Sequence, residues 1–128
     1  MNLGFFIGRL LFGGFFLYNG IQHFKRRDEL AQYAASKSVP YPDMAVEASG
    51  LALLLGGASI ILGLKPKFGA AAIAGFLTTV SPVMHDFWKQ QDPQRTIEMV
   101  NFTKNMALLG GAVALMGVEE PWPLKVAA

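Results

Sequence analysis

The sequence has 128 residues, a length that accommodates one compact domain. Charged residues make up 16% of the chain and hydrophobic residues 52%, whereas a soluble domain carries about 25% charged residues. The net charge of +2, with no basic run beyond Lys25-Arg26-Arg27, gives no indication of nucleic-acid binding. The absence of cysteine excludes disulfides, thiolate catalysis, iron–sulfur clusters and covalently attached c-type haem.

Four apolar runs predict helices that cross a bilayer. A crossing helix needs about 20 mostly apolar residues, and its backbone polar groups must be satisfied within the helix. We therefore predict one membrane domain, an all-α four-helix transmembrane bundle with spans at residues 3–24, 44–64, 68–88 and 102–118. The alternative is a soluble bundle, which would need polar faces at helical spacing, yet residues 51–64 contain Ser59 as their only polar side chain.

The first span lacks the basic leading region of a signal peptide, so we expect it to be retained as a helix. The connection after it, residues 25–43, has Leu30, Tyr33 and Ala34 on one helical face and could form a short interfacial helix. The second connection, residues 65–67, is so short that the second and third spans should form an antiparallel hairpin. The third connection is predicted at residues 89–101.

Small residues recur along the spans. Gly4 and Gly8 form a GxxxG pair, and glycine doublets occur at 13–14, 56–57 and 110–111. Because small residues let helix backbones approach closely in lipid, these positions predict close helix contacts, within the chain or between chains. Lysine and arginine are more frequent in the two long connections than on the opposite side, which predicts that these connections are cytoplasmic and both chain termini are outside.

The polar side chains of the spans gather at the level of the two long connections. Groups at such depth tend to face the bundle interior or a wet cavity. Arg9 shares a helical stripe with two of them, and it either reaches inward along that stripe or snorkels to the opposite surface. No catalytic residue is assigned. The candidate ligand-binding residues are Arg9, Asn19, His23, Glu47, His85, Asp86, Trp88, Lys104 and Asn105.

Helix dipoles divide these charges into two kinds. An acid at the start of a span, like Glu47, and a histidine at the end of one, like His85, are stabilised by the dipole and need no functional explanation. Asp86 and Lys104 both oppose the dipole of their own helix, so we predict that they pair with each other across the third and fourth spans. Glu98 is the competing partner for Lys104.

Several runs spread over nearly the whole chain resemble the bacterial DoxX family. They are Gly8-Arg9, YNGIQHF at 18–24, YAASKSVP at 33–40, HDFW at 85–88 and EMVNFTKNMALLG at 98–110, whereas the Pro-Trp-Pro tail at 121–123 falls outside the resemblance. The resemblance implies a four-helix protein of the bacterial inner membrane. It implies no single activity, because relatives are described as subunits of a thiosulfate:quinone oxidoreductase, as partners in oxidative-stress complexes, or as proteins induced by quinones and catechols.

Three functions fit these observations. The first is a non-catalytic subunit or partner in a redox or oxidative-stress complex of the membrane, which would associate with other subunits or with a second copy. The second is a binder or oxidoreductase partner for a quinone-like ligand, whose carbonyls would accept hydrogen bonds while Trp88 stacks on the ring. The third is a haem or metal site made by His23 and His85. A flavin or nicotinamide enzyme is disfavoured, since no GxGxxG follows a strand.

Overall fold

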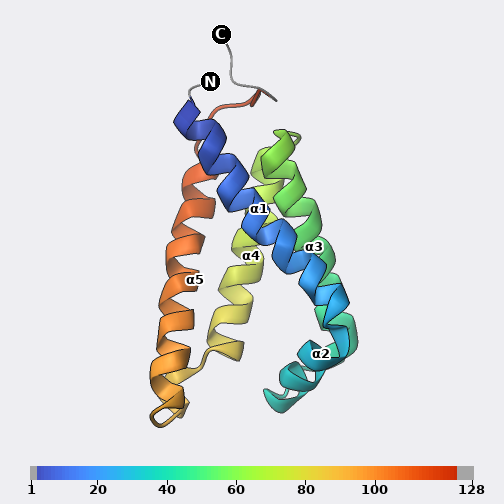
Figure 1. Ribbon diagram of the computed structural model, residues 1–128, viewed down its shortest axis with the longest axis vertical. Coiled ribbons are helices and arrows are strands. Elements are labelled where there is room, and N and C mark those ends of the chain that lie inside the picture. The colour runs from blue at the N-terminus through green and yellow to red at the C-terminus, as the bar shows by residue number, and fades with distance from the viewer. Residues whose placement is uncertain (1–2, 124–128) are drawn as a thin grey trace.

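The computed structural model describes residues 3–123, and all its regular elements in that range are helical (Figure 1). Three segments, Leu3–Lys25, Pro42–Leu62 and Pro66–Lys89, are long and apolar enough to cross a membrane. The last helix is not among them, so the fourth crossing stays a prediction. The elements are α1 (Leu3–Lys25), α2 (Arg27–Ser36), α3 (Pro42–Leu62), α4 (Pro66–Met84), the short 3₁₀ helix η1 (Phe87–Lys89) and α5 (Gln94–Met116).

Prolines set the starts of two spans. α3 and α4 each begin two residues before the predicted boundary, at Pro42 and Pro66, because the fixed φ of proline suits the first helical turn. The predicted helix in the first connection is confirmed as α2. α4 ends at Met84 rather than at residue 88, because Pro82 removes one backbone hydrogen bond from its last turn. The next two residues, His85 and Asp86, bond to the side chains of Glu98 and Lys37.

The largest boundary error concerns α5, which begins at Gln94 rather than at residue 102. Most of the predicted third connection therefore belongs to the helix. Residues 94–101 are largely polar but contain no glycine or proline, so they can be helical without being apolar. The hydroxyl of Thr96 also donates to the Asp92 carboxylate at 2.8 Å and ties the first turn to the preceding loop.

The main helix contacts follow the chain fold, and α5 also approaches α1, since a Cβ added at Gly111 would lie 3.1 Å from the Phe12 ring. α1 packs along α3, α3 also contacts α4, and α4 contacts α5. In Figure 1 the start of α1 and the end of the described chain lie at one end, called here the terminal end, whereas α2, η1 and the start of α5 lie at the other, the loop end. α1 and α5 diverge toward the loop end in this view.

Glycines bring the helix backbones together. A Cβ added at Gly13 would lie 2.8 Å from the Gly57 carbonyl oxygen, and one at Gly20 would lie 2.9 Å from the Gly50 carbonyl oxygen, so α1 and α3 meet backbone to backbone. The close-contact prediction is therefore confirmed at Gly13 and Gly57. Gly8 is different, because it has no atom within 4 Å of its added Cβ and makes no such contact among the described residues.

α3 and α4 approach each other most closely near the terminal end. A Cβ added at Gly56 would lie 3.0 Å from the Gly69 carbonyl oxygen. The two helices are joined by a tight hairpin at Gly63, whose φ of 71° favours glycine. Close packing at this end leaves the space between the helices to widen toward the loop end.

Arg9 is buried at the terminal end, with 1% of its surface exposed. Its Nε donates to the Ile60 carbonyl at 3.1 Å, its Nη2 to the Ile61 carbonyl at 2.9 Å, and its Nη1 to the Pro123 carbonyl. The guanidinium group thus satisfies carbonyls at the C-terminal end of α3, where a positive charge is also favoured by the helix dipole. Trp122 covers it, with the ring centroid 5.5 Å from the guanidinium carbon. Arg9 reaches inward, but it does not join the polar residues of the loop end.

Candidate ligand-binding cavity

A cavity of about 650 Å³ lies toward the loop end, and all five α-helices contribute to its lining. Ligand pockets typically have volumes of about 300–1,000 Å³. Its walls are mainly apolar and include the rings of Phe15, Phe16 and Phe76 together with Leu77 and Val80. No sequence pattern distinguishes these rings, because they stand within the spans like any other apolar residue. The predicted site residues that line the cavity are Asn19, His23, His85, Lys104 and Asn105.

His23 enters the cavity from the end of α1. Its Nδ1 lies 2.7 Å from the carbonyl oxygen of Asn19, one turn earlier. Because a carbonyl oxygen can only accept, Nδ1 carries the proton, and Nε2 is the acceptor of the neutral ring. The imidazole ring meets Phe76 of α4 edge to face at 5.9 Å. Asn19 itself donates to the Phe15 carbonyl at 2.8 Å.

His85 lies just after α4 and is paired with Glu98 of α5. Its Nδ1 is 3.1 Å from Glu98 Oε2. Glu98 is buried, and the side-chain amide of Gln94 lies 3.5 Å from its other oxygen. Glu98, expected as the competing partner of Lys104, is therefore the partner of the histidine instead.

The predicted pair between Asp86 and Lys104 is not formed. Asp86 accepts a hydrogen bond from Lys37 Nζ at 2.7 Å, and the two side chains are only 13% and 15% exposed. This hydrogen bond raises the pKa of Lys37. Lys37 lies 49 residues from Asp86, just beyond the end of α2, so no local pattern could reveal the pairing.

Tyr33 of α2 adds a second link across the mouth of the cavity. Its hydroxyl donates to the Met84 carbonyl at 3.2 Å, at the end of α4. Burial, helped by the negative charge of Glu98, raises the pKa of Tyr33. α2 and the end of α4 are thus connected by two side chains that also line the cavity, Tyr33 and Lys37.

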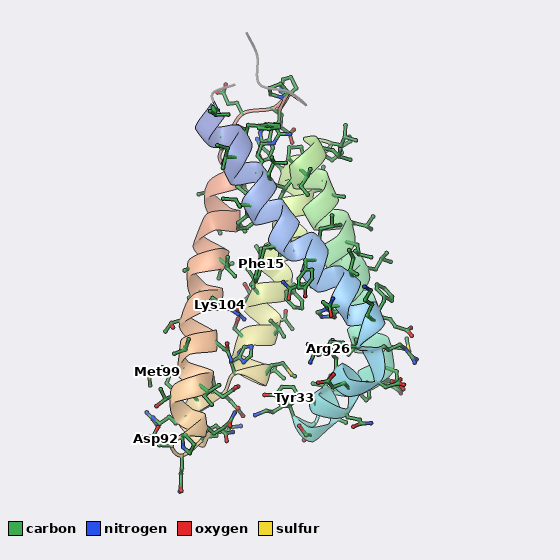
Figure 2. The ribbon with its side chains drawn as sticks, in the orientation of Figure 1. Phe15, Arg26, Tyr33, Asp92, Met99 and Lys104 are labelled. Atoms are coloured by element: carbon green, nitrogen blue, oxygen red, sulfur yellow. The ribbon has the colours of Figure 1, made fainter. Side chains whose placement is uncertain are left out.

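Lys104 and Asn105 line the cavity from α5 and are the least satisfied of its polar groups. Within residues 3–123, no carboxylate lies within 4.0 Å of Lys104, whose Nζ is instead 6.0 Å from the ring centroid of Phe15. Figure 2 shows Phe15 on α1, Lys104 on α5 and Tyr33 on α2 around the space between these helices. Asn105 is only 7% exposed, yet its side-chain amide has no hydrogen-bond partner among the described residues.

Glu47 and Trp88 lie outside the lining. Glu47 accepts a hydrogen bond from Arg27 on α2 at a part-exposed position. Trp88 is 47% exposed and packs edge to face against Phe87 and Phe102 at 5.2 and 5.8 Å. The phenyl and phenol rings that line the cavity are therefore those of Phe15, Phe16, Phe76 and Tyr33, and Trp88 is not among them. The part of the chain that the structure describes contains no group of three or more metal-ligating side chains.

Comparison with known proteins gives one match. The DoxX family model matches residues 4–86, which is well over half of the chain and covers α1 to α4. No curated protein and no solved structure matches the chain.

Proposed function

The chain belongs to the DoxX family, and on that premise we propose that it binds a lipid-soluble, ring-bearing ligand of the quinone class within the membrane. The observation that carries this proposal is the cavity of about 650 Å³, whose apolar walls surround a few polar groups with unused hydrogen-bonding capacity. Relatives described as subunits of a thiosulfate:quinone oxidoreductase, or as proteins induced by quinones, favour the same class.

The chemistry of the lining suits such a ligand. A quinone has a flat apolar body and carbonyl oxygens that accept hydrogen bonds. The ammonium group of Lys104 and the amide of Asn105 are donors without acceptors among the described residues, and the rings of Phe15 and Phe76 offer edges and faces to a flat body. The proposal concerns binding; it assigns no electron transfer to this chain.

Binding can be measured with the purified full-length protein in nanodiscs of zwitterionic lipid. The probe is 2-methyl-1,4-naphthoquinone, and empty discs correct for its partition into lipid. Val80→Phe adds bulk inside the cavity and should remove binding, whereas Val113→Phe adds the same ring on the exposed surface of α5 and should leave binding intact. Equal binding by the native protein and both variants would refute a ligand in this cavity.

A role as subunit of a membrane complex is the second proposal. Gly8, Gly14, Gly75 and Gly110 have no atom within 4 Å of an added Cβ, so they offer outward surfaces that another helix could approach closely. Replacing Gly8 by Leu should then reduce the size of a complex isolated in mild detergent without unfolding the chain. An unchanged complex would refute an interface at Gly8.

For the topology we propose four crossings in the bacterial inner membrane, with both termini outside. Support comes from the 23-residue length of α5 and from the position of the start of α1 and the end of the described chain at the same end of the fold (Figure 1). Cysteines placed at exposed Asp28 and Arg95 should be labelled from the cytoplasmic side, and one at Lys67 from the outside. Labelling of all three from one side would refute the four-crossing topology.

A further inference from the structure

We propose that the cavity takes its ligand as an anion: a ring-bearing molecule with one acidic oxygen group, whose negative charge pairs with Lys104. This inference rests on the proposed function and specifies the charge of the ligand. Two independent features of the described residues support it, the charge balance of the lining and the unused donor beside Lys104.

The charge balance of the lining is positive. The lining includes Lys37, Lys104 and two histidines, and it includes no aspartate or glutamate. The acids closest to it are already engaged, since Asp86 accepts from Lys37 and Glu98 is paired with His85. Among residues 3–123, Lys104 is thus the lysine that lines the cavity without a carboxylate partner.

The depth of Lys104 makes the missing counterion significant. Lys104 follows Glu98 by six residues on α5, which places it about 9 Å further from the loop end at 1.5 Å per residue. The Lys104 side chain is exposed at the protein surface, and in the proposed four-crossing topology a charged group at this depth is costly and usually marks a functional site. The alternative is a lysine that snorkels along α5 toward the loop end. Its Nζ instead lies over the ring of Phe15 on α1.

Asn105 supplies the second donor. It is buried, it lines the same cavity, and its amide has no partner within the described residues. An ammonium and an amide donor suit the two oxygens of a carboxylate, or the ionised hydroxyl and adjacent carbonyl of an acidic hydroxyquinone. A neutral ring would leave the charge of Lys104 uncompensated, whereas an anionic ring would neutralise it.

The test compares two probes of nearly equal size in zwitterionic nanodiscs. They are 1,4-naphthoquinone, which is neutral, and 2-hydroxy-1,4-naphthoquinone, whose hydroxyl group is ionised at neutral pH. The native protein should bind the ionised probe about tenfold or more tightly than the neutral one, because a hydrogen bond to a charged group is worth about that much. Lys104→Met should abolish this preference and keep the neutral probe bound, while Lys104→Arg should retain the preference.

Lys89→Met is the matched control, because Lys89 is exposed on η1 and does not line the cavity; it should retain the preference. If the neutral probe binds but the ionised probe binds no better, the anionic ligand is refuted and the proposed function stands. If neither probe binds, the proposed function itself is refuted. If Lys104→Met does not fold, Lys104→Gln takes its place, with binding of the neutral probe as the measure of an intact cavity.

Phospholipids carry the same chemistry, an anionic oxygen group on an apolar body. The binding measurement is therefore repeated in discs of anionic phospholipid. A preference for the ionised probe that persists there supports a ring-bearing ligand. A preference that disappears only in anionic discs would assign Lys104 to a lipid headgroup and overturn the inference.

Discussion

The adjacent glycines Gly13 and Gly14 offer a direct test of the α1–α3 crossing, because their surroundings are opposite. A Cβ at Gly13 would lie 2.8 Å from the Gly57 carbonyl oxygen and 2.7 Å from Cγ1 of Ile61. A Cβ at Gly14 would have no atom within 4 Å. Replacement of each glycine by alanine therefore adds the same methyl group to the same helix, once at the contact and once away from it.

The expected magnitude follows from the distances. The added methyl group at Gly13 would be about 0.6 Å closer to the Gly57 oxygen than the 3.4 Å at which ordinary contact begins. Because that oxygen belongs to the backbone, α1 and α3 must separate, and overpacking of this kind costs about 1–3 kcal/mol. Both variants gain up to about 1 kcal/mol of helix propensity. Gly13→Ala should thus be less stable than Gly14→Ala by about 1–3 kcal/mol.

The assay is unfolding of the purified protein in mixed micelles, in which the mole fraction of sodium dodecyl sulfate is raised and helicity is followed by circular dichroism. Gly14→Ala should unfold at the same fraction as the native protein or at a higher one, and Gly13→Ala at a lower one. Equal midpoints for the two variants would show that α1 and α3 do not meet at this glycine.

Three further predictions concern side-chain contacts. Asp86→Asn and Lys37→Met should each lower the free energy of unfolding by about 1–3 kcal/mol, and the double variant should recover part of the loss, as measured by a double-mutant cycle in the same micelles. The pKa of Lys37 is raised in the folded protein, so the stability from this pair is present below the ordinary lysine pKa of 10.5 and is lost as the pH rises through the raised value. A cysteine that replaces Leu30, which lines the cavity, should therefore react faster than an exposed reference cysteine only when the pH exceeds the raised pKa of Lys37. Arg9→Lys should lower the thermal unfolding temperature nearly as much as Arg9→Met, because a lysine cannot reach three carbonyls in the geometry of the guanidinium group.

Apolar runs sufficed to predict the helical membrane fold, because lipid demands long apolar helices whatever their sequence details. The predicted helix boundaries were less accurate where a helix begins with polar residues. The first turns of α5 are polar, so a search for apolar residues began that helix eight residues late. Prolines gave usable start signals that the apolar pattern alone does not include, at Pro42 and Pro66.

The sequence predicted that the site residues lie at a common depth in the membrane, but it did not predict which side chains contact one another. The common depth of His23, His85, Lys104 and Asn105 could be read from their positions near span ends, and these residues do line one cavity. The ion pairs could not be read in the same way. A dipole rule predicts that Asp86 needs a cation, but only the position of α2 decides that Lys37 supplies it.

The close approach of α3 and α4 at Gly56 and Gly69 fixes the terminal end of the molecule, whereas the cavity lies toward the loop end. The two helix pairs beside the cavity, α1 with α3 and α4 with α5, are joined by the hairpin at the terminal end and by the Lys37–Asp86 and Tyr33–Met84 hydrogen bonds at the loop end. α4 has 19 residues and is about 28 Å long, so a rotation of about three degrees at the hairpin would move its far end by about 1.5 Å, the length of one carbon–carbon bond. The width of the cavity therefore depends on helix packing at the terminal end as well as on the two hydrogen bonds that link α2 to the end of α4.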